Sequence, residues 1–254
     1  MSFENQVAVA TGAASGMGLL FAENFATLGG KVAMCDVNEA VLTQKVAAIN
    51  EKFPGSALGI LCDVRDYAQV CAARDKAVAA FGRIDILVNF AGGTALRVLG
   101  VDRTRYPEFP DVPIEVYDWG LDVNLKGPFY FAHAVLKQMR GQKSGLIVNI
   151  GSITGMEGSN SGMDYPTAKA GLMFGLTKSI AQFGAKYGIR CVCVSPGPVL
   201  TRAAMAEMKT MLGRAADPQE IVDLILFIAS DKGQFINGEN IMIDGGRNAM
   251  QREH

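Results

Sequence analysis

The 254-residue sequence has few of the groups on which metal sites and hydrolytic triads depend. It contains two histidines, His133 and His254, and no two cysteines in a C-x-x-C spacing. A zinc cluster or a Ser-His-Asp hydrolase therefore has little material, and we expect no metal site. Cys191 and Cys193, two of the five cysteines, would share one face of a strand, which suits buried and reduced thiols.

Long apolar runs and an excess of one charge are also missing. No apolar run reaches the roughly 18 residues that a membrane span requires. The first residues, MSFENQVAVATG, lack the basic and apolar segments of a secretory signal. The formal net charge of −1 gives no electrostatic reason to bind nucleic acid or a membrane surface. We therefore expect a soluble cytoplasmic protein with a small-molecule substrate, no nucleic acid and no membrane.

Apolar residues and glycine are plentiful, and their arrangement predicts the fold class. The apolar fraction of 49% is ample for a large core, and 29 glycines indicate many tight turns. Short apolar runs alternate with amphipathic ones along the chain. Strands are predicted at 7–10, 31–36, 57–63, 84–89, 145–152, 189–195 and 240–244. Helices are predicted from a glycine turn to about Leu28, at 39–53, 66–81 and 114–139, from Pro166 to about Tyr187, and at 218–230.

Strands that are apolar almost throughout and alternate with helices imply a parallel sheet covered on both faces. No internal repeat or low-complexity linker divides the chain. We therefore predict an α/β fold, with residues 1–254 forming a single Rossmann-type doubly wound domain. In such sheets ligands bind beyond the carboxyl ends of the strands, where the order of connections reverses.

A glycine-rich turn, TGAASGMG at 11–18, follows the first predicted strand. Gly12, Gly16 and Gly18 permit a tight turn, close approach of a phosphate, and close packing of helix on sheet. A plain strand–helix turn is the alternative, because the spacing is G-x-x-x-G-x-G. Asp36 ends the second strand, where a carboxylate would accept hydrogen bonds from the adenosine ribose. Asp36 would also repel the extra phosphate of NADP, and no arginine stands beside it, so we predict NAD.

Polar and small residues follow the third and fourth strands at the same sheet edge. They are Asp63 and Val64, and the segment NFAGG at 89–93. Each alone suits an ordinary turn, but their shared position favours contact with the adenine and the linking ribose.

The stretch DYPTAKA at 164–170 places a tyrosine four residues before a lysine. Proline fits the first turn of a helix, so Tyr165 and Lys169 are expected on one helical face. A phenol beside an ammonium loses its proton more easily, which makes an acid–base catalyst. An ordinary amphipathic helix start is the alternative.

Seven motifs in order make the whole sequence resemble the short-chain dehydrogenase/reductase family, in its common shorter length class. They are TGAASGMG, NFAG, Asn124 in DVNLKG, Ser152 in IGSITG, Y-x-x-x-K, PGPVLT at 196–201 and IDGG at 243–246. One departure is Phe90, where the family usually has a second asparagine. We expect it to affect a strand-end contact more than the chemistry.

The resemblance implies that the catalytic residues are Asn124, Ser152, Tyr165 and Lys169. Tyr165 would exchange the proton, Ser152 would hold the substrate oxygen, and Lys169 would tune the phenol and hold the nicotinamide ribose. Asn124 would hold a water that relays the proton. The cofactor-binding residues would be Gly12, Ser15, Gly16, Met17, Gly18, Asp36, Asp63, Val64, Asn89, Ala91, Gly92, Tyr165, Lys169, Pro196, Gly197, Val199 and Thr201.

Three segments are expected to border the substrate site. The insertion at 94–113 contains Arg97, Arg103 and Arg105, which could contact an anionic substrate; a solvated loop is the favoured alternative. The lid at 198–214 is short, and its methionines at 205, 208 and 211 are expected on a helix packed against the core. The polar segment at 154–164 holds Glu157, Ser159 and Asn160, which could hydrogen-bond to hydroxyl groups.

These features predict an NAD-dependent enzyme that interconverts a secondary alcohol and a ketone on a small polyhydroxy substrate, such as a sugar, polyol or sugar acid. A reductase of 3-oxoacyl thioesters or hydrophobic ketones is the enzyme alternative, made less attractive by that class's usual preference for NADP. An NAD(H)-binding regulatory or scaffold protein is the alternative from another class. The resemblance also implies a homotetramer or homodimer, formed through the helices around Asn124 and Tyr165.

Overall fold

The computed structural model describes residues 1–102 and 104–250. Seven parallel strands form one sheet in the order β3-β2-β1-β4-β5-β6-β7. The strands are β1 (Val7–Thr11), β2 (Lys31–Asp36), β3 (Ala57–Leu61), β4 (Ile86–Asn89), β5 (Gly145–Ile150), β6 (Ile189–Pro196) and β7 (Asn240–Ile243). The doubly wound α/β prediction is confirmed, and the order of connections reverses between β1 and β4.

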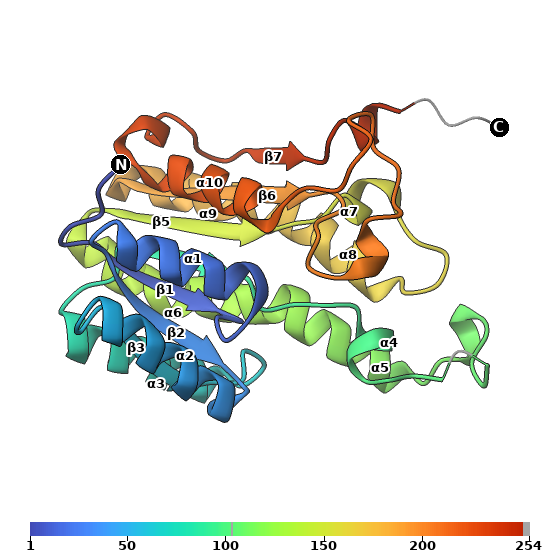
Figure 1. The fold of residues 1–254 in the computed structure, drawn as a ribbon, viewed down its shortest axis with the longest axis horizontal. Helices are drawn as coiled ribbons and strands as arrows, with labels where there is room; N and C mark the ends of the chain where they lie inside the picture. Colours follow the sequence, from blue (N-terminus) through green and yellow to red (C-terminus); the bar gives the residue numbers. More distant parts are fainter. Residues whose placement is uncertain (103, 251–254) are drawn as a thin grey trace.

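Helices cover both faces of the sheet (Figure 1). On one face lie α1 (Gly16–Thr27), α2 (Glu39–Lys52) and α10 (Pro218–Ala229). On the other lie α3 (Tyr67–Phe81), α6 (Gly127–Gln142) and α9 (Thr177–Gly184). Alternate residues of each strand enter the two cores: Ala8 and Ala10 of β1 pack toward α1, whereas Val9 packs toward α3 and α6. This pattern follows from the two-residue period of a strand buried on both faces.

The two long helices predicted around the catalytic residues each contain a π-helical turn. The first runs through α5 (Ile114–Leu121), η2 (Asp122–Lys126) and α6, and it ends three residues later than predicted. The second runs through α8 (Asp164–Ala170), η3 (Gly171–Leu176), α9 and the 3-10 turn η4 (Ala185–Tyr187). π-helical turns are frequent at functional sites, and η2 contains Asn124.

Short elements gather beyond the carboxyl ends of the strands, to the right of the arrowheads in Figure 1. They include α4 (Ala95–Val98), α7 (Thr154–Glu157) and α8. Single 3-10 turns are η1 (Phe109–Asp111), η5 (Ala203–Met205), η6 (Asp231–Gly233) and η7 (Arg247–Ala249). Within 1–102 and 104–250, no helix has the length and apolar character needed to cross a membrane.

The lid segment differs from its prediction. The methionines at 205, 208 and 211 were expected on a helix packed against the core. They lie instead on an irregular segment with one 3-10 turn, and Met211 is 65% exposed. The segment contains Gly213 at φ +73°, and its Arg214 side chain pairs with Glu220 at the start of α10. A positive φ at Gly213 interrupts any helix there, and the Arg214–Glu220 pair ties the end of the segment to α10.

Candidate active site

The glycine turn after β1 forms the floor of a cavity of about 680 Å³ at the switch point. Gly12 and Gly16 have φ of +63° and +55°, which side chains other than glycine rarely adopt. A Cβ on Gly18 would lie 2.4 Å from the carbonyl oxygen of Gly12, so the third glycine permits α1 to approach β1. Ser15, the N-cap of α1, makes no side-chain capping bond. The first N–H groups of α1 are therefore left for an anion such as a pyrophosphate.

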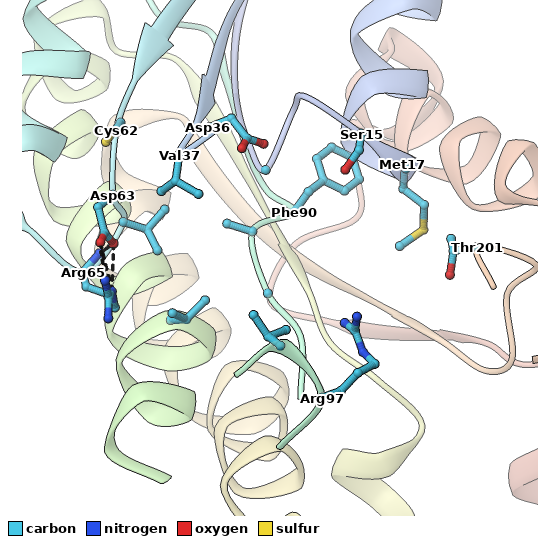
Figure 2. A pocket seen from close by; sticks show the side chains of 18 of the residues that line it. Ser15, Met17, Asp36, Val37, Cys62, Asp63, Arg65, Phe90, Arg97 and Thr201 are labelled. Carbon is cyan, nitrogen blue, oxygen red and sulfur yellow. Dashed lines mark hydrogen bonds and ion pairs between the residues drawn. The ribbon is translucent and has the colours of Figure 1, made fainter. Parts of the chain in front are cut away.

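Asp36 reaches this cavity from the end of β2 (Figure 2). Its Oδ2 accepts a hydrogen bond from the Ala14 N–H at 3.0 Å, and its Oδ1 accepts one from the Asn38 N–H at 2.9 Å. These bonds fix the carboxylate beside the glycine turn. Each oxygen keeps further lone pairs that a ribose hydroxyl can use.

Eleven predicted cofactor residues line the cavity: Gly12, Ser15, Gly16, Met17, Gly18, Asp36, Asp63, Val64, Ala91, Gly92 and Thr201. Asp63 is already engaged, because Arg65 binds both of its oxygens, at 3.0 and 2.6 Å. This arginine holds the pKa of the Asp63 carboxyl below its usual value. Pairing between Asp63 and Arg65 is visible on one wall of the cavity in Figure 2.

Other predicted cofactor residues lie behind the wall rather than in it. The Asn89 side chain donates to Asn149 Oδ1 at 2.9 Å inside the sheet. Gly197 packs against Asp244, where a Cβ would lie 2.7 Å from the Asp244 Cα. Pro196 ends β6, and Val199 is buried in a bridge with Ala216. None of these four residues is in the lining of the cavity.

A second cavity, of about 450 Å³, contains Tyr165 in its wall. Polar residues surround the tyrosine there: Thr94, Thr154, Ser159 and Ser161. Burial raises the pKa of the Tyr165 phenol, while a hydrogen bond with Ser152 and the charges of Arg202 and Arg97 lower it. The structure thus brings Tyr165 and Ser152 together as predicted, although burial prevails in this state.

Lys169 is buried beneath the tyrosine. Its Nζ lies 5.3 Å from the centre of the Tyr165 ring and donates to the Ile150 carbonyl at 2.7 Å. Burial lowers the pKa of the Lys169 ammonium to about 8. Arg202 and Arg97, rather than Lys169, are the charges that lower the pKa of the phenol. The predicted tuning by Lys169 is therefore not evident here.

Asn124 is wholly buried, and both N–H donors of its amide are used. Nδ2 donates to the carbonyls of Gly93 and Gly120, each at 2.8 Å, and Oδ1 accepts from the Gly93 N–H at 3.0 Å. A relay water would have to use the remaining lone pair of Oδ1. A Cβ on Gly92 would lie 2.7 Å from that oxygen and 3.4 Å from Lys169 Nζ, so Asn124, Gly92 and Lys169 meet at one point.

Several residues around the site were not predicted to bind the cofactor. Phe90, which replaces an expected asparagine, packs its ring 5.6 Å from that of Phe21. Arg202 lines the cavity and directly follows Thr201, so its place after the PGPVLT motif is the sequence signal that could have identified it.

Residues that were predicted to contact the substrate are engaged elsewhere. Glu157 pairs with Arg247 at 3.0 Å and is not a free hydroxyl acceptor. Arg105 stacks over Tyr106 instead of lining either cavity, and Arg103 and residues 251–254 lie outside the described chain.

No cluster of three His, Cys, Asp or Glu side chains suited to a metal ion exists within 1–102 and 104–250. A dinucleotide is the cofactor that the residues fit. The glycine cradle, the uncapped start of α1 and the ribose-side carboxylate Asp36 lie in one cavity. The acid–base candidates lie next to it.

Comparison with known proteins agrees with this geometry. A family model described as enoyl-(acyl carrier protein) reductase matches residues 12–248. The 3-oxoacyl-(acyl-carrier-protein) reductase FabG of Escherichia coli K12 is 33% identical, over 97% of this chain and 98% of its own. The D-threitol dehydrogenase of Mycolicibacterium smegmatis is 36% identical, over 96% of this chain and 93% of its own.

A solved structure of NAD⁺-bound xylitol dehydrogenase superposes with a TM-score of 0.85 at 27% identity, covering 97% of this chain and 100% of that one. Together with the cavity, the family match over 12–248 shows an oxidoreductase that acts on CH–OH groups with a nicotinamide cofactor. The chain belongs to the short-chain dehydrogenase/reductase family.

Proposed function

We propose that the protein is an NAD-dependent dehydrogenase that interconverts a secondary alcohol and a ketone on a small polyhydroxy substrate. One observation carries the proposal: Tyr165 lies in the wall of a cavity with the hydroxyl side chains of Thr94, Thr154, Ser159 and Ser161, and this cavity shares Arg97 with the dinucleotide cavity. A carbinol bound there would lie between the proton-exchanging phenol and the cofactor.

Each residue has a role that its surroundings support. NAD supplies the hydride acceptor when it is bound. Tyr165 takes the proton from the alcohol oxygen, and Ser152 donates a hydrogen bond to that oxygen and stabilises its developing charge. Lys169, fixed by the Ile150 carbonyl, holds the nicotinamide ribose and keeps a positive charge below the phenol. Asn124 anchors the loop at Gly93 and offers Oδ1 to a relay water.

The preference for NAD rests on the end of β2. Asp36 is fixed by two backbone N–H groups, and Val37 beside it is 65% exposed and offers no positive charge. Arg65, another arginine in the wall, is occupied by Asp63. A ribose phosphate would therefore meet a carboxylate without a compensating cation.

The polyhydroxy substrate rests on the hydroxyl groups of the second cavity and on the similarity to dehydrogenases of D-threitol and xylitol. A 3-oxoacyl thioester or another hydrophobic ketone is the second candidate. The similarity to FabG and the apolar wall residues Leu96 and Val101 favour it.

The test is reduction of NAD, followed by absorbance, against polyols, sugars, sugar acids and simple secondary alcohols, with NADP and 3-oxoacyl thioesters in parallel. We expect turnover with NAD and polyhydroxy compounds only. Tyr165→Phe should abolish turnover and leave NADH binding intact. Normal turnover by Tyr165→Phe would overturn the assignment, and tight NADH binding with no turnover of any compound would favour a regulatory or scaffold protein.

We also propose that the protein is a cytoplasmic homotetramer or homodimer. Phe129 of α6, Phe174 of η3 and Phe183 of α9 are 51%, 48% and 43% exposed on the helices that cover one face of the sheet. Their burial between copies would remove a large apolar surface from water. Light scattering should show two or four chains, and a monomer at micromolar concentration would contradict the proposed assembly.

All five cysteines are free, which suits the cytoplasm as a reducing compartment.

A further inference from the structure

Arg97 occupies the wall that the two cavities share. It is the residue that lines both the dinucleotide cavity and the cavity of Tyr165. The short helix α4 brings it there directly after the end of β4 and the glycines at 92 and 93. Figure 2 shows its guanidinium pointing into the cavity, across from Ser15 and Met17.

The guanidinium of Arg97 has no ion-pair partner among residues 1–102 and 104–250. Arg202, in the dinucleotide cavity, donates to the Met205 sulfur at 3.5 Å and has no ion pair within the described residues. Both charges lower the pKa of the Tyr165 phenol, which places the two arginines within electrostatic reach of the reacting oxygen. Neither cation has a carboxylate partner in the part of the chain that the structure describes, and Arg97 lines the cavity of Tyr165.

The carboxylates on this side of the site do not balance these cations. Glu157 is occupied by Arg247, with contacts of 3.0 and 3.2 Å. Asp164 is 4% exposed, and burial raises the pKa of its carboxyl. Asp63 pairs with Arg65, and Asp36 lies at the end of β2, in the dinucleotide cavity. The space around Tyr165 therefore has an excess of positive charge.

We propose that Arg97, assisted by Arg202, binds an anionic group of the substrate, so that the preferred substrate is a hydroxy acid or a phosphorylated polyol rather than a neutral polyol. A guanidinium forms paired, charge-assisted hydrogen bonds with a carboxylate or a phosphate, which orients as well as binds the ligand. The anion would lie within a few bonds of the carbinol carbon, because Arg97 and Tyr165 line the same cavity. This inference rests on the proposed function.

The test compares three matched substrates of four to six carbons: a polyol, the corresponding aldonic acid and the corresponding polyol phosphate. We expect kcat/KM of the wild type to be at least about 10-fold higher for one of the two anions than for the polyol. Arg97→Gln should raise the KM for that anion by about 10- to 100-fold more than it changes the KM for the polyol. Arg97→Lys should restore part of the loss, and Arg105→Gln, outside both cavities, should change nothing.

The dissociation constant of NADH distinguishes a substrate site at Arg97 from a cofactor site. If Arg97→Gln weakens NADH binding and all three substrates equally, Arg97 serves the cofactor phosphates and the inference is wrong. Equal turnover of acid, phosphate and polyol by the wild type would also overturn it. If none of the three turns over, the proposed function fails, and titration of the acid and the phosphate onto the NADH complex decides the inference alone. Binding by the wild type and its loss in Arg97→Gln would support an anion site; equal binding by both would reject it.

Discussion

Asn124 and Gly93 exchange two hydrogen bonds: Asn124 Nδ2 donates to the Gly93 carbonyl at 2.8 Å, and Asn124 Oδ1 accepts from the Gly93 N–H at 3.0 Å. This reciprocal pair joins the π-helical turn η2 to the loop that leads into α4 and Arg97. The side chain thus positions the wall between the two cavities, in addition to any contact with water.

The pair predicts the effect of Asn124→Asp. The change removes both donors and turns an oxygen toward the carbonyls of Gly93 and Gly120, which lose these two hydrogen bonds. Each lost buried hydrogen bond costs about 1–3 kcal/mol, or about 2–6 kcal/mol for the two, so the melting temperature should fall by roughly 4–24 °C. Turnover should fall with it, because the wall at Arg97 loses its anchor.

Differential scanning calorimetry and steady-state rates measure both effects. Gln44→Glu, an amide-to-carboxylate change at an exposed position of α2, is the matched control and should leave both unchanged. An Asn124→Asp protein that melts with the wild type would show that the pair contributes nothing.

From the position of Asp36 we predict a preference for NAD over NADP and a way to reverse it. The wild type should use NAD with a kcat/KM about 100-fold above that for NADP, because a ribose phosphate would face the carboxylate. Asp36→Ser with Val37→Arg removes the repulsion and adds a charge-assisted hydrogen bond. A change of about 2–3 kcal/mol corresponds to a shift of roughly 30- to 150-fold toward NADP.

Rates with both cofactors at a saturating alcohol concentration provide the measurement. Asp36→Ser alone is the control, and it should lose preference without gaining affinity for NADP. An unchanged ratio in the double variant would place the ribose elsewhere.

The elements that the sequence predicted best are those with local signals. Strands apolar on both faces, such as 31–36, and a glycine turn that needs positive φ at Gly12 and Gly16 leave patterns in neighbouring residues. The spacing of Tyr165 and Lys169 similarly places both at the start of one helix, although that helix begins at Asp164, before the proline.

The elements that the sequence could not predict depend on partners far along the chain. Asn89 ends β4 at the edge of the sheet where the cofactor was predicted to bind. Its side chain nevertheless bonds to Asn149, 60 residues away in the sequence. Glu157 is neutralised by Arg247, 90 residues away. Arg97 and Arg105 lie in the same predicted insertion, but Arg97 is in α4 and lines a cavity, whereas Arg105 lies outside that helix and stacks on Tyr106.

From the burial of Lys169 we predict that the free energy of unfolding rises with pH in the alkaline range. Its pKa is about 8 in the folded protein, below the ordinary 10.5, because burial disfavours the charge. Between these values the unfolded chain holds a proton that the folded protein has released, so the free energy of unfolding rises with pH. The slope contributed by one such group is at most about 1.4 kcal/mol per pH unit.

Lys169→Met removes this contribution. Urea unfolding at pH 7.5 to 10 should show the wild type gaining stability relative to the variant as pH rises through about 8. Lys178→Met, on the exposed side of the same helical run, should parallel the wild type. Parallel profiles for Lys169→Met and the wild type would mean that Lys169 keeps its proton throughout.

From the burial of Asp164 we predict the opposite effect: the stability contributed by this carboxyl falls as the pH rises from the acidic range. Neither of its carboxyl oxygens has a hydrogen-bond partner among the described residues, and its Oδ2 lies against Gly120, where a Cβ would be 1.8 Å away. Burial raises the pKa of this carboxyl above 3.8. The stability that Asp164 contributes is therefore present below pH 3.8 and is lost as the pH rises through the raised pKa.

Asp164→Asn replaces the carboxylate by a neutral amide of the same shape and should remove this loss. At pH 7.5 the variant should melt above the wild type by roughly 2–6 °C, equivalent to about 1–2 kcal/mol, and the difference should shrink as the pH falls toward 4. Asp118→Asn, at an exposed position of α5, should follow the wild type at every pH. A difference between Asp164→Asn and the wild type that stays constant with pH would show that the carboxyl has the same pKa folded and unfolded. Burial beside Gly120 would then have no energetic consequence for ionisation.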